Sequence, residues 1–396
     1  MTRFIRAIAL ILCLILSLSA AALADSLGPA RSYDELLSLA ASASDGDVIL
    51  VSGEIVAAPD APLSPASAIR IRSSSEGHAV IGALCLRDAF ITFDDIDLRG
   101  SLTIEGTSAV ELTGGVSVSG ADGREGIRFT GGGTLLLDSG SLVVGGSGSA
   151  GVAVSHESGD FYGHLDGTIR GGSGSTGGVG VEIAPLQQSG ALMISGVITG
   201  GDGASVGGHA LNLYGLSGNA YVTLDGTLRG GDGYIGGNGA QIVSAAGSVI
   251  IGVSGEIAGG RGESHGGNAL VLMNVEGGAS ISLTGALRGG DVTGSVATPG
   301  TSLLVVGDTT SSHTVLGRCL LEEGRRIAAQ APQIQPDLTP LPEIVPSVDH
   351  TTTLADPSEG EEPADAPDPS DIPDEAGTAL PEPLEDPADP NAAPQA

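Results

Sequence analysis

The sequence predicts an all-β fold, a single-stranded right-handed parallel β-helix (solenoid) with a short N-terminal capping helix and a disordered acidic C-terminal tail. Two observations predict it. A glycine motif recurs every 29 or 30 residues, and apolar residues alternate at fixed offsets from each copy. Periods of this length are typical of solenoids. The motif Gly-x-(Ile/Leu)-x-Gly-Gly begins at Gly167, Gly196, Gly226, Gly255 and Gly285.

Residues 1–24 have the pattern of a secretory signal peptide. Arg3 and Arg6 precede a short apolar run, and Ala22-Leu23-Ala24 stands before Asp25, as at a signal cleavage site. The run is shorter than the about 18 residues that span a bilayer. We therefore expect a mature chain that begins at Asp25, has no membrane span, and is secreted or displayed on the cell surface.

Residues 25–46 are predicted to form an N-terminal capping segment. Ser32 and Glu35 have the spacing of a capping box, which opens a short amphipathic helix. The first coil of a solenoid has an open strand edge that would otherwise recruit other chains. A helix at this point would cover that edge.

Residues 47–315 are predicted to form the solenoid itself. Apolar residues two positions before and two positions after each leading glycine, such as Leu224 and Leu228, have the period-two spacing of strands with one buried face. Glycine-rich loops of six and seven residues alternate after the motifs, so the unit is a pair of coils. We expect their glycines to serve backbone with positive φ and close stacking of the coils. This 59-residue double repeat starts at Gly167, and residues 226–284 are a copy of 167–225.

The chain after the solenoid divides into two parts. Residues 316–330 are predicted to form a C-terminal cap helix. After Arg326 there are sixteen Asp or Glu, fifteen of the 21 prolines and no Lys or Arg, so residues 331–396 are predicted to be a disordered acidic tail. The net charge of −31 and the absence of lysine argue against nucleic acid and anionic membrane as partners. Cys85 and Cys319 lie too far apart in the chain for a disulfide framework, and we expect two buried thiols.

The pattern of strands resembles that of known secreted proteins. A short helix followed by DGDVILV at 45–51 and by repeated short strands resembles the right-handed parallel β-helix proteins of the pectate-lyase-like superfamily. The later glycine-rich repeats resemble bacterial surface and autotransporter-type adhesin passenger domains. The resemblance covers roughly residues 30–320 and implies the fold. It implies no single activity, because that superfamily includes polysaccharide lyases, glycoside hydrolases and non-catalytic surface proteins.

Two sets of repeated side chains are candidate ligand-binding residues. Arg170, Arg229 and Arg288 occupy one position in every second coil, which spaces them by roughly 10 Å. They could hold an acidic polymer, or they could lie over the surface and pair with nearby Asp residues. Tyr162 and Tyr221 share a second repeat position and could supply aromatic contacts to a sugar.

Carboxylates suggest two further kinds of site. Asp202 and Asp232 follow Gly-Gly pairs in adjacent coils and could bind Ca²⁺, the only cofactor that we consider; the alternative is a pair of solvated Asp-Gly turns. The densest charged group runs from Asp94 to Arg99. Strand alternation places Asp95 and Asp97 on one face of it.

The function that we predict is that of a secreted or cell-surface, non-enzymatic scaffold with an adhesin-like binding or structural role. We predict no catalytic residues, a polysaccharide or a surface protein as partner, and a monomeric state. The alternatives are a polysaccharide-processing enzyme, either lyase or glycoside hydrolase, and a non-catalytic carbohydrate-binding module. Three or more acidic and Arg side chains converging in one outward groove would favour the enzyme.

Overall fold

The computed structural model describes residues 25–58, 60–75, 78–155, 160–186, 190–275, 278–307, 313–316 and 319–326. The chain divides into two compact units, Met1–Gln333 and Ile334–Ala396, and all described residues belong to the first. The predicted signal peptide and the predicted acidic tail both lie outside the described residues.

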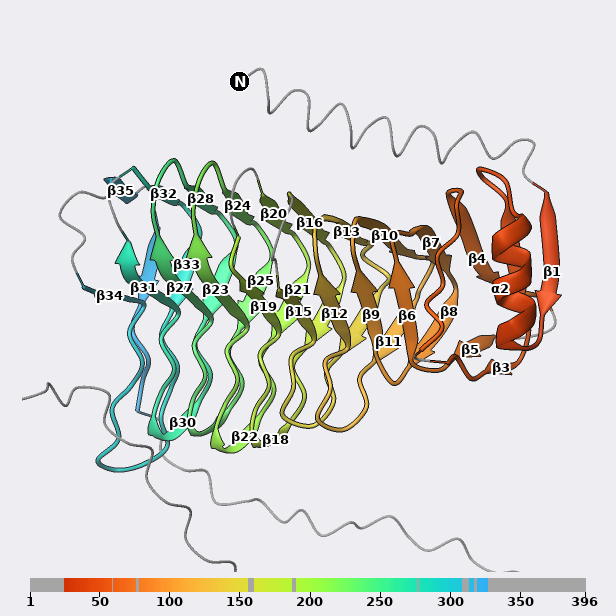
Figure 1. Cartoon of the computed structure of the whole chain (residues 1–396). Coiled ribbons are helices and arrows are strands. Elements are labelled where there is room, and N and C mark those ends of the chain that lie inside the picture. The colour runs from red at the N-terminus through yellow and green to blue at the C-terminus, as the bar shows by residue number, and fades with distance from the viewer. Residues whose placement is uncertain are drawn as a thin grey trace, which may run out of the picture. The chain divides into compact units, whose positions relative to one another are not determined.

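The described chain winds as a parallel β-solenoid, in which every strand pairs with the equivalent strands of the neighbouring coils (Figure 1). Three long sheets, here named A, B and C, surround the core, and a short sheet D lies beyond it. The twelve strands of sheet A are β1 (Ser26–Ala30), β2 (Val48–Val51), β4 (Ile69–Ser73), β7 (Phe90–Asp94), β10 (Ser108–Thr113), β13 (Gly133–Leu137), β16 (Phe161–Leu165), β20 (Ala191–Ile194), β24 (Tyr221–Leu224), β28 (Ile250–Val253), β32 (Ser280–Leu283) and β35 (His313–Leu316).

Sheets B and C complete the wall of the solenoid. The strands of sheet B are β3 (Glu54–Ile55), β5 (Ala79–Ile81), β8 (Ile96–Arg99), β11 (Ser117–Ser119), β14 (Leu142–Val144), β17 (Thr168–Arg170), β21 (Val197–Thr199), β25 (Thr227–Arg229), β29 (Glu256–Ala258), β33 (Ala286–Arg288) and β36 (Leu320–Glu322). The strands of sheet C are β6 (Leu84–Arg87), β9 (Leu102–Glu105), β12 (Ile127–Thr130), β15 (Val152–Ser155), β19 (Val181–Ala184), β23 (Leu211–Leu216), β27 (Ala240–Ala245), β31 (Leu270–Val275) and β34 (Leu303–Val306).

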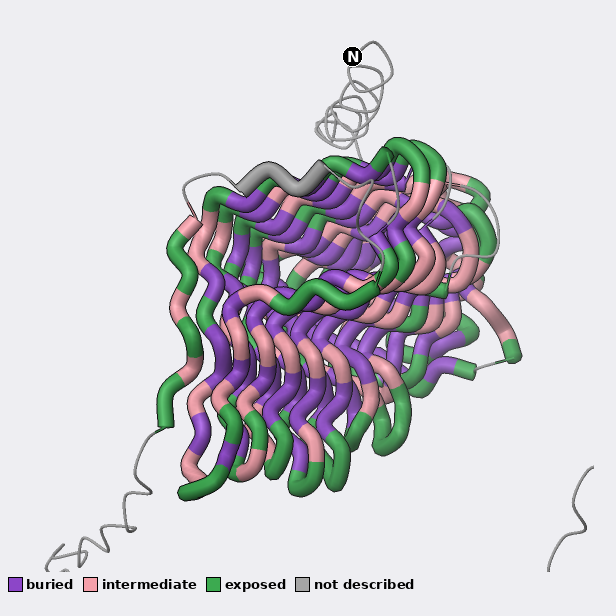
Figure 2. Tube along the Cα trace, turned by 90° about the vertical axis from the view of Figure 1, so that its left-hand side faces the viewer, coloured by how far each residue is buried: buried purple, intermediate pink, exposed green. Residues whose placement is uncertain are grey.

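The strand register places equivalent residues of the repeat directly above one another. Ile169 pairs with Ile198, Ile198 with Leu228, and the column continues through Ile257 to Leu287. All five side chains are fully buried. Figure 2 shows the buried residues running as continuous stripes from coil to coil. The predicted parallel solenoid and its repeat are therefore confirmed.

The N-terminal cap has the predicted helix. It is α2 (Tyr33–Ser42), the only helix in the described part of the chain, and the Ser32 side chain accepts a hydrogen bond from the Glu35 backbone N–H at 3.3 Å. The Glu35 carboxylate reaches one residue further than a standard capping box and accepts from the backbone N–H of Arg31 at 2.7 Å. Leu36 and Ala40 are buried, so the helix covers the first coil. This helix is not long and apolar enough to cross a bilayer.

Strand β1, which was not predicted, lies outside β2 as the outermost strand of sheet A. It contains Pro29, which has no backbone N–H to offer a further strand. The N-terminal end is thus closed both by a helix and by a strand edge that pairs poorly.

Between sheets B and C the chain leaves the core and returns, forming what we call the glycine arm (residues 171–180, 200–210, 230–239 and 259–269). Sheet D lies at its tip, with β18 (Gly174–Thr176), β22 (Gly203–Val206), β26 (Gly233–Ile235) and β30 (Gly262–His265). Figure 2 shows the tips as exposed loops below the core. A Cβ on Gly171 would lie 2.0 Å from the Gly178 carbonyl oxygen of the same coil, so only glycine permits this close approach.

The glycines of the arm correct part of our interpretation of the motif. We expected them to serve both close stacking and backbone with positive φ. Close stacking is confirmed, but Gly171, Gly172, Gly177 and Gly178 are not among the residues with positive φ. Their role is to let two backbone segments and their neighbouring coils touch without side chains between them.

The predicted cap helix over 316–330 is wrong where the structure describes this segment. Leu320–Glu322 forms β36, which pairs in parallel with β33, and Arg326 forms a bridge with Val292. The pairing satisfies the free edge of β33 and places Leu321 over Leu287, which a helix would not do. Residues 317–318 and 327–330 lie outside the described residues.

Both cysteines are free and only partly buried, whereas we expected two buried thiols. Cys85 lies on sheet C, and Cys319 packs against the core ahead of β36. Burial raises the pKa of each thiol, and for Cys85 the nearby carboxylate of Glu105 raises the pKa further. Both groups are therefore weak nucleophiles at neutral pH.

Candidate functional site

The outgoing segment of each glycine arm carries two outward side chains with a Gly-Gly pair between them. The first side chain is the last residue of a sheet B strand, and the second follows three residues later. Since glycine has no side chain, a bare backbone floor separates two columns. The first column is Arg170, Thr199, Arg229, Ala258 and Arg288, and the second is Ser173, Asp202, Asp232, Arg261 and Asp291.

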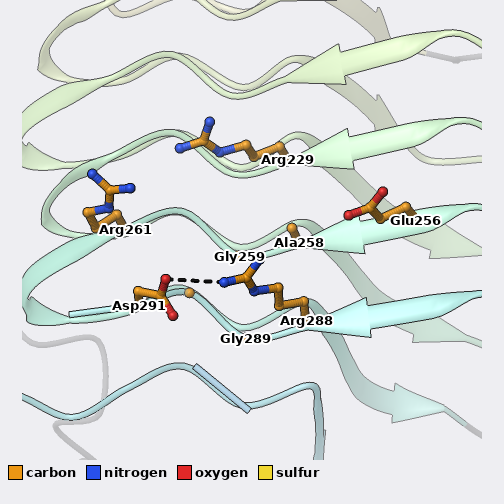
Figure 3. Close-up of a pocket in the computed structure, with 9 residues that line it drawn as sticks. Arg229, Glu256, Ala258, Gly259, Arg261, Arg288, Gly289 and Asp291 are labelled. Carbon is orange, nitrogen blue, oxygen red and sulfur yellow. Dashed lines mark hydrogen bonds and ion pairs between the residues drawn. The ribbon is translucent and has the colours of Figure 1, made fainter. Parts of the chain in front are cut away.

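A cavity of about 300 Å³, which we call the arginine pocket, lies between these columns (Figure 3). It is lined by Arg229, Glu256, Ala258, Gly259, Arg261, Arg288, Gly289, Gly290 and Asp291. Its three arginines come from three successive coils. The predicted residues Arg229 and Arg288 therefore do lie at one site, whereas Arg170 lies two strands away from Arg229 in the same column.

Two ion pairs define the limits of the arginine pocket. Arg229 pairs with Asp232 at 3.0 Å and Arg288 with Asp291 at 3.3 Å, which confirms for these two arginines the alternative of pairing with nearby Asp residues. Each pair spans the glycine floor from one column to the other. In the coil between them Ala258 is too short to reach across, which leaves the pocket open. Within the described residues Arg261 makes no ion pair, so its guanidinium is the cation available to a ligand.

The aspartates of the second column connect neighbouring coils. Asp202 Oδ1 accepts the backbone N–H of Asp232 at 2.8 Å, and Asp232 Oδ1 accepts that of Arg261 at 2.7 Å. One oxygen of each carboxylate is thus committed to the backbone, and Asp232 also holds Arg229. This is the geometry of a turn that ties coil to coil. A calcium ion bound by Asp202 and Asp232 stays a prediction.

The predicted tyrosines lie on a different surface from the arginines. Tyr162 and Tyr221 share one outward column of sheet A, with Ala191 between them, which separates them by roughly 10 Å. Burial raises the pKa of Tyr162, and its hydrogen bond with Asp160 adds to this. The tyrosines and arginines therefore belong to separate faces and form no common site.

A second depression lies on the sheet C side, nearer the N-terminal end. It is lined by Ser101, Thr103, Glu105, Arg124, Glu125, Arg128 and Thr130. Further along sheet C, burial raises the pKa of Glu182, and the carboxylate of Glu125 contributes to the shift. A carboxyl group with a raised pKa near an ionised carboxylate is an arrangement that acid catalysis uses.

The charged run from Asp94 to Arg99 is not the single strand that we expected. Asp94 ends β7 of sheet A, Asp95 forms a corner with positive φ, and Asp97 lies on β8 of sheet B. Asp94 lies within 3.6 Å of Arg70 on sheet A. Asp95 and Asp97 instead share His78, whose ring nitrogens lie 3.3 Å and 3.1 Å from their carboxylate oxygens. Every one of these carboxylates has a protein partner, which suits a structural network.

Comparison with known proteins adds no assignment: no family model, no curated protein and no solved structure matches this chain. The fold is thus shown by the structure itself, while the superfamily suggested by the strand pattern stays a prediction.

Sequence reasoning missed Arg261 and Glu256 as residues of the site. The repeat pattern contained a signal for both, because residues 226–284 copy 167–225. Arg261 stands where the first copy has Asp202, and Glu256 where it has Val197. These departures from the duplication concentrate charge in one coil, which a search for regularity does not find.

Proposed function

We propose that this chain is a non-enzymatic, adhesin-like scaffold that acts outside the cell and binds an acidic polysaccharide in the arginine pocket. The observation that carries the proposal is the unpaired guanidinium of Arg261 between the Arg229–Asp232 and Arg288–Asp291 bridges. A carboxylate or sulfate group entering from the open side would accept hydrogen bonds from Arg261 with two further cations close by.

The arginine pocket gathers three arginines with Glu256 and Asp291, so it also meets the criterion that would favour an enzyme. The engagement of its aspartates nevertheless favours binding over catalysis. Asp232 and Asp291 each hold an arginine and also accept a backbone N–H of the next coil. Carboxylates engaged in this way keep their shape and charge and are poor proton donors. The side chains around the pocket stand on or beside paired strands, so little ordering of the protein is needed when a ligand binds.

The floor of the pocket suits a polymer better than a single small anion. Gly259, Gly289 and Gly290 present bare backbone along the solenoid axis, and the wall columns continue into neighbouring coils. A polymer can therefore extend past the pocket toward the preceding coils over the same kind of floor. At physiological ionic strength charges beyond about 8 Å are largely screened, so the local charge is decided by the groups that line the pocket, three arginines against Glu256 and Asp291.

Binding to immobilised uronate-containing, sulfated and neutral polysaccharides tests the proposal. Arg261→Gln should weaken binding to the acidic polymers by about tenfold or more, the loss expected for one charge-assisted contact, and the wild-type affinity should fall with added salt. Arg72→Gln, at an exposed arginine on sheet A, is the matched control with the same change in charge. Equal binding of Arg261→Gln and wild type would refute the assignment.

The sheet C depression supports a second candidate, a polysaccharide-processing enzyme. Glu105, Glu125, Arg124 and Arg128 meet the criterion of three or more acidic and Arg side chains in one outward depression. Glu105 and Glu125 line the depression and would be the carboxylate pair, whereas Glu182 is not among its lining residues. The same polymer panel, assayed for new reducing ends, tests this candidate. Turnover that Glu125→Gln abolishes would favour the enzyme, and no turnover by wild type would exclude it for those substrates.

A further inference from the structure

The last coil of the solenoid exposes residues that belong to the core. Val305 stands over Leu272 in sheet C, and Leu321 stands over Leu287 in sheet B. Leu272 is 2% exposed and Leu287 is fully buried, whereas Val305 is 46% and Leu321 is 47% exposed. Inward-pointing side chains are thus open to solvent at this end, in the part of the chain that the structure describes.

The strands of the last coil also present their backbone. β34 pairs only with β31, β35 only with β32, and β36 only with β33 among the described strands. Their outer edges carry unpaired N–H and C=O groups beside an apolar centre, a combination that recruits further strands. The N-terminal end differs, since α2 and the Pro29-bearing β1 cover it.

In place of the monomer that we expected from the sequence, we propose that the C-terminal end of the solenoid docks against the same end of a second copy. A partner must offer three strand edges around an apolar centre with the same cross-section. The C-terminal end of another copy does so, and the covered N-terminal end does not. Contact between like ends is isologous, so it gives a closed dimer and no fibre.

The chain at this end carries both signs of charge, with Glu323 accepting a hydrogen bond from Ser302 and Arg326 donating one to the Ala297 carbonyl. Glu322 and Glu323 are followed by Arg325 and Arg326 on the same turn of the chain. Under two-fold symmetry a rim with equal numbers of acidic and basic groups can set each sign against the other. Such a dimer would also carry two arginine pockets, which raises avidity for a polymer, although the dimer itself does not depend on the proposed ligand.

Light scattering of the chain without its predicted signal peptide tests the proposal, under reducing conditions so that Cys319 cannot cross-link. We expect a dimer whose mass falls to that of a monomer on dilution. Val305→Asp should weaken association by at least about tenfold, while Val56→Asp, at a position that is 78% exposed elsewhere, should leave it unchanged. Circular dichroism establishes that each variant is folded.

Arg325→Glu provides a second variant in case the core substitution prevents folding. It places an added acidic group on the rim and should also weaken the dimer. A wild-type chain that is monomeric at every concentration would overturn the proposal. So would a dimer that both Val305→Asp and Arg325→Glu leave intact.

Discussion

The backbone N–H of Gly208 donates a 2.8 Å hydrogen bond to the carbonyl of Gly201 in its own coil, and the carbonyl of Gly208 accepts one of 2.8 Å from Gly231 in the next coil. The same alternation continues to Gly324. The two segments of the arm are therefore joined by an unbroken series of backbone hydrogen bonds along the solenoid.

The first prediction concerns this series. Gly201→Ala would place a Cβ 2.2 Å from the Gly172 carbonyl oxygen, and the backbone there cannot move without disturbing both neighbouring coils. We expect a loss of roughly 3 kcal/mol or more in the free energy of unfolding, measured by chemical denaturation. Gly252→Ala is the control, because a Cβ there meets no atom within 4 Å; its change should stay within about 0.5 kcal/mol.

The second prediction concerns His209, whose Nδ1 accepts the backbone N–H of Asn238 at 2.9 Å. Burial lowers the pKa of His209 below its ordinary value of 6.5. The neutral ring therefore contributes stability that is complete above pH 6.5 and is lost as the pH falls through the lowered pKa. Unfolding midpoints measured between pH 7.5 and pH 5 should show this loss.

His209→Asn should remove that part of the pH dependence. Asn238 and Asn268 hold equivalent positions in the next two coils and accept backbone N–H groups through Oδ1, so asparagine keeps the hydrogen bond without a titrating ring. His164→Asn, at an exposed histidine, should leave the loss of stability below pH 6.5 in place. An unchanged pH profile in His209→Asn would show that another group is responsible.

A third prediction separates the two roles of the arm aspartates. Asp202→Asn and Asp232→Asn both keep an Oδ1 acceptor for the next coil, but only Asp232→Asn also loses an ion pair, the one with Arg229. Asp232→Asn should therefore cost up to about 1 kcal/mol more than Asp202→Asn, a difference that shrinks in high salt. If added Ca²⁺ raises the unfolding midpoint of wild type but of neither variant, the predicted calcium site is supported.

The fourth prediction concerns acid stability. Partial burial by itself would raise the pKa of Asp97, but hydrogen bonds with Ser117, His78 and Arg99 hold it below its ordinary value of 3.8. The ionised carboxylate thus contributes stability above about pH 4 that is lost as the pH falls through the lowered pKa. Ser117→Ala should reduce this acid-dependent loss, whereas the exposed Ser119→Ala on the same strand should not. Acid titration of the unfolding midpoint measures both.

The solenoid could be predicted because its core repeats in the sequence. Ile169 and its four equivalents lie at equal distances along the chain, and parallel stacking turns equal distance into direct contact. The capping helix was likewise visible, in Ser32 and Glu35. The role of the arm glycines was harder to predict, since a glycine that permits close approach and one that adopts positive φ look the same in a sequence.

The C-terminal end and the arginine pocket could not be predicted in full from the sequence, because both depend on which strands pair in three dimensions. The sequence around Leu320–Glu322 led us to expect a helix, but this segment forms a strand because it pairs with the free edge of β33. The arginine pocket was predicted in part, because Arg229 and Arg288 repeat. Arg261 does not repeat, and only the strand register shows that it stands between them.

In the glycine arm the Gly-Gly pairs and the outward residues beside them have different roles, and this difference has an evolutionary consequence. Gly-Gly pairs carry the contacts on which the coils depend, while the residues beside them point outward and add only side-chain hydrogen bonds and ion pairs. Asp202 and Arg261 hold the same place in two copies of one repeat, with opposite charge and the same backbone path. Single substitutions at these wall positions can therefore rewrite what the surface recognises while leaving the folding of the chain intact, and gene duplication supplies new copies in which to do so.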